Sequence, residues 1–227
     1  RFSFQRFLSI KLGKKQKDEE RLTTRLSLAD LPVADKVYSS SIFLRQMFSQ
    51  AWLEFIQIIR DPYFIAIMVG ALFFLFTDGW FGFPTFGTPS LPLTYYMIEV
   101  KDFNYGLFVY IILIFYTGEV VHRDKSVKYN LISDSLPVPN WMVYGSKFLA
   151  IVLVGFVMAN LVIVSGVANQ IIKGYFNFEF DKYFTDLYLI EFPEYVELAM
   201  LAFFMHILVN QKFLGHILTI GLWFLLG

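Results

Sequence analysis

Long apolar blocks separated by short polar segments constrain this chain more than any other feature. The blocks run over residues 63–81, 103–121, 141–172, 193–209 and from 213 onward. A helix needs about 20 mainly apolar residues to cross the hydrocarbon core of a bilayer. Charged residues make up 17% of the chain, below the roughly 25% of a soluble domain. The sequence therefore predicts an all-α, polytopic membrane helix bundle with about five spans.

A polar, basic leader precedes the blocks. Residues 1–41 carry clustered cations such as Lys14, Lys15 and Arg21. Two interpretations stay open: a solvated linker beside the membrane, and a segment attracted to anionic lipid headgroups. Both place the leader in the cytoplasm. Because the chain begins at Arg1 and ends within an apolar block, we expect it to be an internal piece of a longer polypeptide.

The segment 42–61 has apolar residues at helical spacing. Phe48, Trp52 and Phe55 fall on one half of such a helix, and Gln50 and Glu54 fall on the other. This pattern predicts an amphipathic helix that lies in the membrane interface. A soluble amphipathic helix has the same pattern, but the spanning block that follows favours the interface.

Prolines and glycines predict where the first elements begin and end. Asp61-Pro62 is a typical helix start, with an acidic N-cap and proline at the first helical position. The transmembrane domain is therefore expected to occupy residues 62–227. Within it, five glycines and prolines in 82–104 favour an ordered loop over a helix.

Residues 119–147 form a charged island between the second and third blocks. It begins at Glu119, and a carboxylate at a helix C-terminus opposes the helix dipole unless it is paired. Arg123 stands one helical turn further on, so we expect these two residues to pair. The alternative is that Glu119 simply faces water.

The middle of the island has the spacing of a short helix, from about residue 122 to 133. Val127 and Leu131 would share one face of it, while Arg123, Lys128 and Asp134 keep the rest polar. Leu136-Pro137 should end this helix, and Asn140 should cap the next. A short charged helix between two spans is suited to bind a soluble partner and to transmit that partner's movement to the spans. The alternative is an ordinary solvated loop.

The distribution of lysine and arginine predicts the orientation. The island and the turn at 210–212 carry more of these residues than the loops after the first and third spans. Cytoplasmic loops are enriched in lysine and arginine. We therefore expect an integral membrane protein whose leader, island and 210–212 turn are cytoplasmic.

The third block contains candidates for span packing or substrate contact. Gly155 and Ala159 are four residues apart, a spacing that allows a neighbouring helix to approach closely. Asn160 and Ser165 are polar in an apolar block. They are first interpreted as interhelical hydrogen-bond partners, with substrate contact as the alternative.

The sequence contains no recognisable catalytic constellation. Its three histidines, His122, His206 and His216, lie in different segments, and no His-Glu-x-x-His motif is present. His206 and His216 could meet across a short turn, but a metal role is the less favoured interpretation. The phosphate-binding loop motif is missing, and the net charge is zero, which gives no indication of nucleic-acid binding. We expect no catalytic, cofactor-binding or metal-binding residue in this chain.

Several island motifs resemble those of ABC-2 type transporter permeases. They are Gly118-Glu119, His122-Arg123-Asp124-Lys125, Leu136-Pro137-Val138-Pro139-Asn140 and Ser146-Lys147. Members of that family often have Arg-Glu where this chain has Arg123-Asp124. The resemblance implies a six-span unit preceded by an interfacial helix, and a coupling helix that contacts an ATP-binding subunit. It implies coupling roles for Glu119, Arg123, Asp124, Val127, Lys128 and Leu131.

A narrower resemblance concerns residues 92–99 and 208–216, Pro-Leu-Thr-Tyr-Tyr-Met-Ile-Glu and Leu-Val-Asn-Gln-Lys-Phe-Leu-Gly-His. These are similar to bacterial permease units joined to a C-terminal M1-type aminopeptidase. The similarity implies a bacterial inner-membrane protein, with zinc only in a downstream peptidase domain.

The sequence thus favours the membrane part of an ATP-driven permease, with ATP bound by a partner subunit. Its expected partners are the lipid bilayer, an ATP-binding cassette subunit, and a second permease half or an identical copy. Two alternatives remain: a membrane anchor for an M1-type aminopeptidase, and a non-transporting membrane scaffold.

Overall fold

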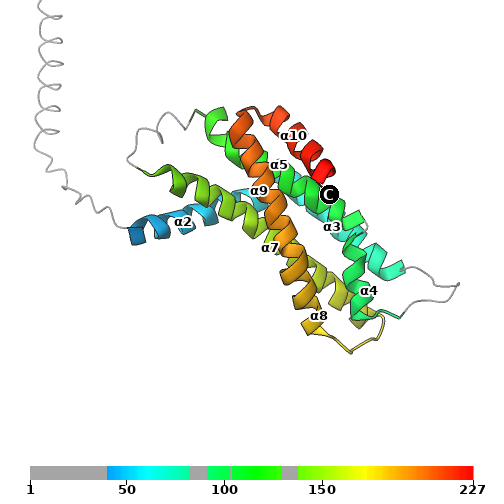
Figure 1. Cartoon of the computed structure of the whole chain (residues 1–227). Coiled ribbons are helices and arrows are strands. Elements are labelled where there is room, and N and C mark those ends of the chain that lie inside the picture. Colours follow the sequence, from blue (N-terminus) through cyan, green and yellow to red (C-terminus); the bar gives the residue numbers. More distant parts are fainter. Residues whose placement is uncertain (1–39, 82–90, 103, 129–137, 227) are drawn as a thin grey trace, which may run out of the picture. The chain divides into compact units, whose positions relative to one another are not determined.

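The computed structural model describes residues 40–81, 91–102, 104–128 and 138–226, and these residues form helices and short helical turns without a strand (Figure 1). This confirms the all-α class. The leader lies outside the described residues, apart from its last positions. The elements are α2 (Ser40–Ile59), α3 (Pro62–Phe81), α4 (Thr94–Glu99), η1 (Val100–Asp102), α5 (Asn104–Ser126), α7 (Asn140–Ile172), α8 (Phe180–Phe184), η2 (Thr185–Glu191), α9 (Phe192–Val209) and α10 (Lys212–Leu226).

Within the part of the chain that the structure describes, four helical stretches are long and apolar enough to cross a membrane. They are α3, α5, α7 and the continuous run Phe180–Val209 formed by α8, η2 and α9. The fifth expected span is α10, an apolar helix of 15 residues. At 1.5 Å per residue it is about 22 Å long, shorter than a full crossing. The prediction of a polytopic helical membrane bundle is confirmed.

Helix α5 is central to the bundle, because α3, α7, α9 and α10 all pack against it. Its buried residues lie on several sides of the helix and include Tyr105, Ile112, Thr117 and Gly118. The Tyr105 hydroxyl donates a hydrogen bond of 2.6 Å to the Met158 carbonyl of α7. Helix α5 therefore contacts four of the other long helices, while α2 packs on α7.

The bundle has two polar ends. At the island end, α3 begins, α5 ends, α7 begins and α9 turns into α10. There the Tyr116 hydroxyl donates to Asp61 Oδ1 at 3.2 Å. At the opposite end, called the loop end, Asn104 Nδ2 donates to Asp78 Oδ2 at 3.0 Å. Lys173 Nζ donates there to the Gly79 carbonyl at 2.9 Å.

Some helix boundaries follow the sequence and one does not. Asp61 caps α3 as expected, because its Oδ1 accepts from the Tyr63 N–H at 2.7 Å. The turn at Asn210 is also confirmed: this residue has a φ of 55° and links α9 to α10. The expectation that Asn140 caps the third span is wrong. Asn140 is the first residue of α7, and the extended backbone of Pro139 precedes it.

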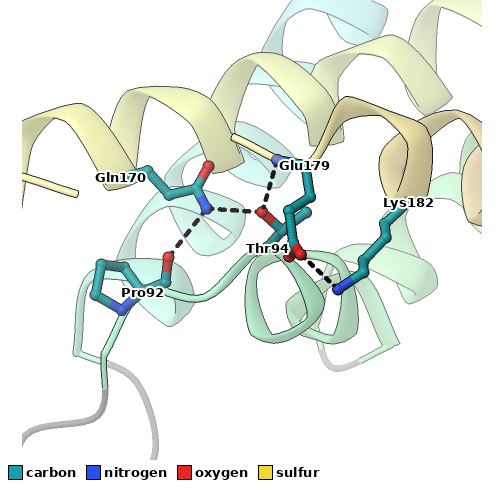
Figure 2. Close-up of polar contacts among 5 residues, drawn as sticks. All are labelled: Pro92, Thr94, Gln170, Glu179 and Lys182. Atoms are coloured by element: carbon teal, nitrogen blue, oxygen red, sulfur yellow. Dashed lines mark hydrogen bonds and ion pairs between the residues drawn. The ribbon is translucent and has the colours of Figure 1, made fainter. Parts of the chain in front are cut away.

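The segment after the first span is more helical than expected. Residues 91–102, predicted as loop, contain α4 and η1. Figure 2 shows what holds α4 in place: Gln170 Nε2 at the end of α7 donates to the Pro92 carbonyl at 3.0 Å and to Thr94 Oγ1 at 3.1 Å. Thr94 Oγ1 also accepts from the Glu179 N–H at 3.3 Å. These long-range bonds have no signature in the local sequence.

The fourth span begins earlier than predicted. The apolar block 193–209 predicted a span that starts at Pro193, but the helical run starts at Phe180 and passes through η2, a π-helical stretch. The ring of a proline inside an α-helix clashes with the backbone carbonyl four residues earlier. A wider, π-helical turn ahead of the proline relieves this clash. This explains why Pro193 lies within a continuous helix.

Helix α2 agrees with the expected amphipathic segment to within two residues at each end. It packs beside α7 (Figure 1). Ala51, Phe55 and Ile58 are buried, whereas Phe48 and Trp52 are exposed. The apolar half of α2 therefore has one side on the protein and one side free. Its position relative to a membrane stays a prediction.

Candidate functional site

The first part of the island is an extension of the second span. A separate helix was expected from residue 122, but α5 continues without interruption to Ser126. The turn that follows contains Lys128, whose φ is 58°. Val127 is exposed in this turn. Leu131 lies outside the described residues, so its place beside Val127 on one face stays a prediction.

The last two turns of α5 carry four charged residues, Glu119, Arg123, Asp124 and Lys125, which we call the α5 hub. Each hub residue contacts a partner from a different part of the chain. These partners are Lys212 at the start of α10, Glu54 of α2, Lys147 of α7, and Asn210 in the turn after α9, in the order of the hub residues.

The expected pair between Glu119 and Arg123 is wrong. Arg123 instead forms an ion pair with Glu54, and Glu119 forms one with Lys212. The physical reason is burial: the side chain of Glu54 is only 9% exposed. A buried carboxylate needs a cation more than a half-exposed one does. The spacing within one helix could not show that another helix presents such a carboxylate.

Lys147 is the most deeply buried cation of this region. Its side chain is 4% exposed, and its Nζ lies 2.6 Å from Asp124 Oδ2. Taking an ammonium out of water costs several kcal/mol unless a carboxylate compensates. Asp124 supplies that charge and thereby fixes the start of α7 to the end of α5. The sequence indicated both Asp124 and the Ser146-Lys147 motif but did not pair them.

The hub gives the island a defined mechanical connection. Val127 follows α5 directly, and the four side-chain contacts join the end of α5 to α2, α7, α10 and the turn after α9. The arrangement suits transmission between a surface loop and a bundle.

Three histidines come together just inside the hub. The ring centroids of His206 and His216 are 4.6 Å apart, and those of His122 and His206 are 5.4 Å apart. The approach of His206 and His216 across the α9–α10 turn is thus confirmed. A side chain at Gly118 or Gly215 would collide with the ring of His206. Among the described residues, no group of three or more His, Asp or Glu side chains is arranged to hold a metal ion.

The candidates in α7 take part in packing between helices. Asn160 Oδ1 accepts a hydrogen bond of 2.7 Å from the Tyr188 hydroxyl of η2, as an interhelical partner should. Gly155 and Ala159 are buried, and a Cβ on Gly155 would lie 3.5 Å from Tyr195 Cβ of α9. The hydroxyl of Ser165 is buried without a hydrogen-bond partner among the described residues. Contact of these residues with a substrate stays a prediction.

A second charged centre was not foreseen from the sequence. At the loop end, Lys101 Nζ lies 3.0 Å from Asp102, 3.3 Å from Asp186 and 3.3 Å from Glu191. Lys101 and Glu191 are 6% and 8% exposed. The sequence offered one indication of this centre: a single lysine in the loop after the first span, and an acidic segment after the third span. Without the fold, that lysine is indistinguishable from a solvated loop residue.

The charge of Lys101 is secured by its neighbours. Burial alone would lower the pKa of Lys101, but the charges of Glu191, Asp102 and Asp186 outweigh burial and raise this pKa above its ordinary value. Lys101 is therefore an ammonium ion at neutral pH. Three carboxylates surround this one cation.

Comparison with known proteins identifies the family. A sequence model of the ABC-2 family transporter protein matches residues 51–227, more than three quarters of the chain. A search of curated proteins and a search of solved structures each found no match. The matched region includes the hub, all four full-length spans and α10. The chain thus belongs to the ABC-2 family of transporter proteins, as an integral membrane permease component.

Proposed function

We propose that this permease is driven by a separate ATP-binding subunit that docks on the island, and that the α5 hub distributes the resulting movement through the bundle. The observation that carries the proposal is the set of hub contacts to four parts of the chain. A solvated loop would need no such connections. The family match supports an ATP-binding partner in general, and the hub supports the place of contact.

The docking face is proposed to contain Val127 and Leu131. Val127 is 66% exposed although it is apolar. A partner that covers such a side chain removes apolar surface from water, which contributes to the free energy of binding. Replacing both residues by aspartate would place charges in the interface, and desolvating each would cost several kcal/mol. The spans should still fold, because their stability comes from packing and lipid.

The test measures ATPase binding and stimulation by the full-length permease in nanodiscs. The Val127→Asp/Leu131→Asp variant should bind the ATPase at least about ten-fold more weakly. The matched control is Phe176→Asp/Asn177→Asp, which adds the same charge at exposed positions of the loop end. If the island variant binds and stimulates like the wild type, the island is not the docking site.

Co-purification separates this proposal from a membrane scaffold without transport. Full-length protein isolated from its native membrane should retain an ATP-binding cassette subunit. A second permease half, or an identical copy, is part of the proposal because the family resemblance implies a paired unit. If the isolated protein contains no such ATPase and none restores transport, the scaffold alternative gains support.

The aminopeptidase fusion remains a proposal that rests on the resemblance of residues 92–99 and 208–216. The second of these segments forms the α9–α10 turn and the start of α10. A His-Glu-x-x-His motif downstream in the full-length reading frame would support the fusion and place zinc in that domain. Its absence from the complete reading frame would remove both the fusion and the bacterial assignment drawn from it.

A further inference from the structure

A groove runs along the outside of the bundle between α5 and α10. Its volume is about 780 Å³, within the roughly 300–1,000 Å³ of small-molecule sites. It extends along α5 from Gly106 to Phe115, a length of about 14 Å. Leu107 and Ile111 line one wall, and Ile220 and Trp223 line the other. The groove is therefore apolar over most of its length.

One end of the groove is charged. Lys101, Asp102 and Glu191 line this end, and Asp186 lies behind them against Lys101. The single ammonium leaves two of the three carboxylates without a counter-charge. Asp186 Oδ2 is also buried and accepts no hydrogen bond from the described residues. Ionisable residues that face a cavity in a membrane protein commonly mark a ligand pathway.

We propose that this groove binds a lipid-like amphiphile with a primary ammonium head and a single apolar chain, which enters sideways from the bilayer. The ligand ammonium adds a second positive charge beside Glu191 and Asp102, which reduces the surplus at this end from two negative charges to one. It also donates hydrogen bonds that carboxylates accept. The chain lies between α5 and α10, where Leu107 and Ile111 are exposed. That this amphiphile is the transported cargo rests on the proposed function, whereas its binding does not.

The charge pattern selects this occupant over two others. A neutral lipid would fill the apolar part but leave the carboxylate surplus unchanged. An anionic lipid would meet Lys101, but Lys101 is already enclosed by three carboxylates. Only a cationic head lowers the electrostatic energy of this end of the groove.

The test uses quenching of Trp223, which lines the groove and lies 5.7 Å from Tyr110 between ring centroids. Full-length protein in phosphatidylcholine nanodiscs is titrated with ω-bromododecylamine, ω-bromododecanol and ω-bromododecanoate. The signal is the part of the quenching that the Trp223→Phe variant lacks. We expect saturable quenching by the amine, with a half-saturation about ten-fold lower than that of the alcohol.

Two variants test the carboxylates. Glu191→Gln and, independently, the more exposed Asp102→Asn should each reduce the preference for the amine several-fold. Glu197→Gln, an exposed carboxylate of α9 outside the groove, should leave it unchanged. Equal binding of alcohol and amine, tighter binding of the carboxylate, or an unchanged preference in both variants would overturn the proposal. ATPase stimulation is not part of this assay, so its failure would affect only the proposed function.

Discussion

Arg123 neutralises a carboxylate that packing has removed from water. Glu54 is held in the contact between α2 and the rest of the bundle, where its side chain is 9% exposed. An isolated charge there would be far more costly than an isolated charge on the surface. The pair therefore contributes little net attraction to stability. Its main effect is that Glu54 is not left as an uncompensated buried charge.

Substitution of Arg123 by glutamine should lower the free energy of unfolding by at least about 2 kcal/mol. This approaches the loss of stability found when one partner of a buried ion pair is removed. The measurement is thermal unfolding in a mild detergent. The double variant Glu54→Gln/Arg123→Gln should regain much of the loss, because it leaves no charge uncompensated. A single variant as stable as the wild type would mean that water reaches Glu54.

For individual residues, the sequence predicts which side chains form contacts between helices better than it predicts the partners of those contacts. Glu119, Arg123 and Asp124 were all singled out, and all three form cross-helix ion pairs. Their partners are 93, 69 and 23 residues away. Local spacing favoured a contact one turn along the same helix, but burial of Glu54 decided the pairing. The centre at Lys101 was missed because its burial arises only when η1 meets η2.

The apolar half of helix α2 is divided between the protein and the outside. Ala51, Phe55 and Ile58 are buried in the protein, whereas Leu44 and Phe48 are exposed. The helix packs beside α7, whose 33 residues make it about 50 Å long. That length exceeds the roughly 40–45 Å of a whole bilayer, so α7 has room for both a span and a contact at the membrane surface.

Trp52 reports where α2 lies. It is 55% exposed on the free apolar side, and amphipathic helices bury such residues about 5–10 Å into the interface. Lipids brominated near the carbonyl groups should quench Trp52 more strongly than lipids brominated near the chain ends. The Trp52→Phe variant supplies the background. Stronger quenching from the chain ends would place α2 across the bilayer, and no quenching would place it in water.

The elements follow from the sequence where the pattern is local. Asp61-Pro62 starts α3, and the left-handed Asn210 ends α9, as their residue types predict. The end of α5 did not follow, because polar residues after an apolar block were interpreted as the end of a helix. Their charges are compensated sideways by other helices, so the helix continues through them.

On the scale of the whole molecule, polar contacts gather at the two ends and apolar packing fills the region between them. The island end has the hub, and the loop end has the Gln170 and Lys101 contacts. Lysine and arginine are more abundant at the island end, which favours the cytoplasm for it. The orientation itself stays a prediction.

Cysteine labelling tests this orientation cleanly, since the chain has no native cysteine. Ser126→Cys reports the island end, and Asn177→Cys reports the loop end; both positions are exposed. In intact cells an impermeant maleimide should modify Asn177→Cys and leave Ser126→Cys unmodified until the membrane is opened. The reverse result would invert the topology. Modification of both from outside would mean that α7 does not cross.

Helix ends ordinarily fray, because their final backbone groups lack partners. The end of α5 is different, since four side chains clamp its last two turns to neighbouring helices. The backbone beyond it changes direction at Lys128, a residue in the sparsely populated left-handed region. Helix α5 is therefore held in place as far as Ser126, and the turn of Val127 and Lys128 is where the chain leaves the helix.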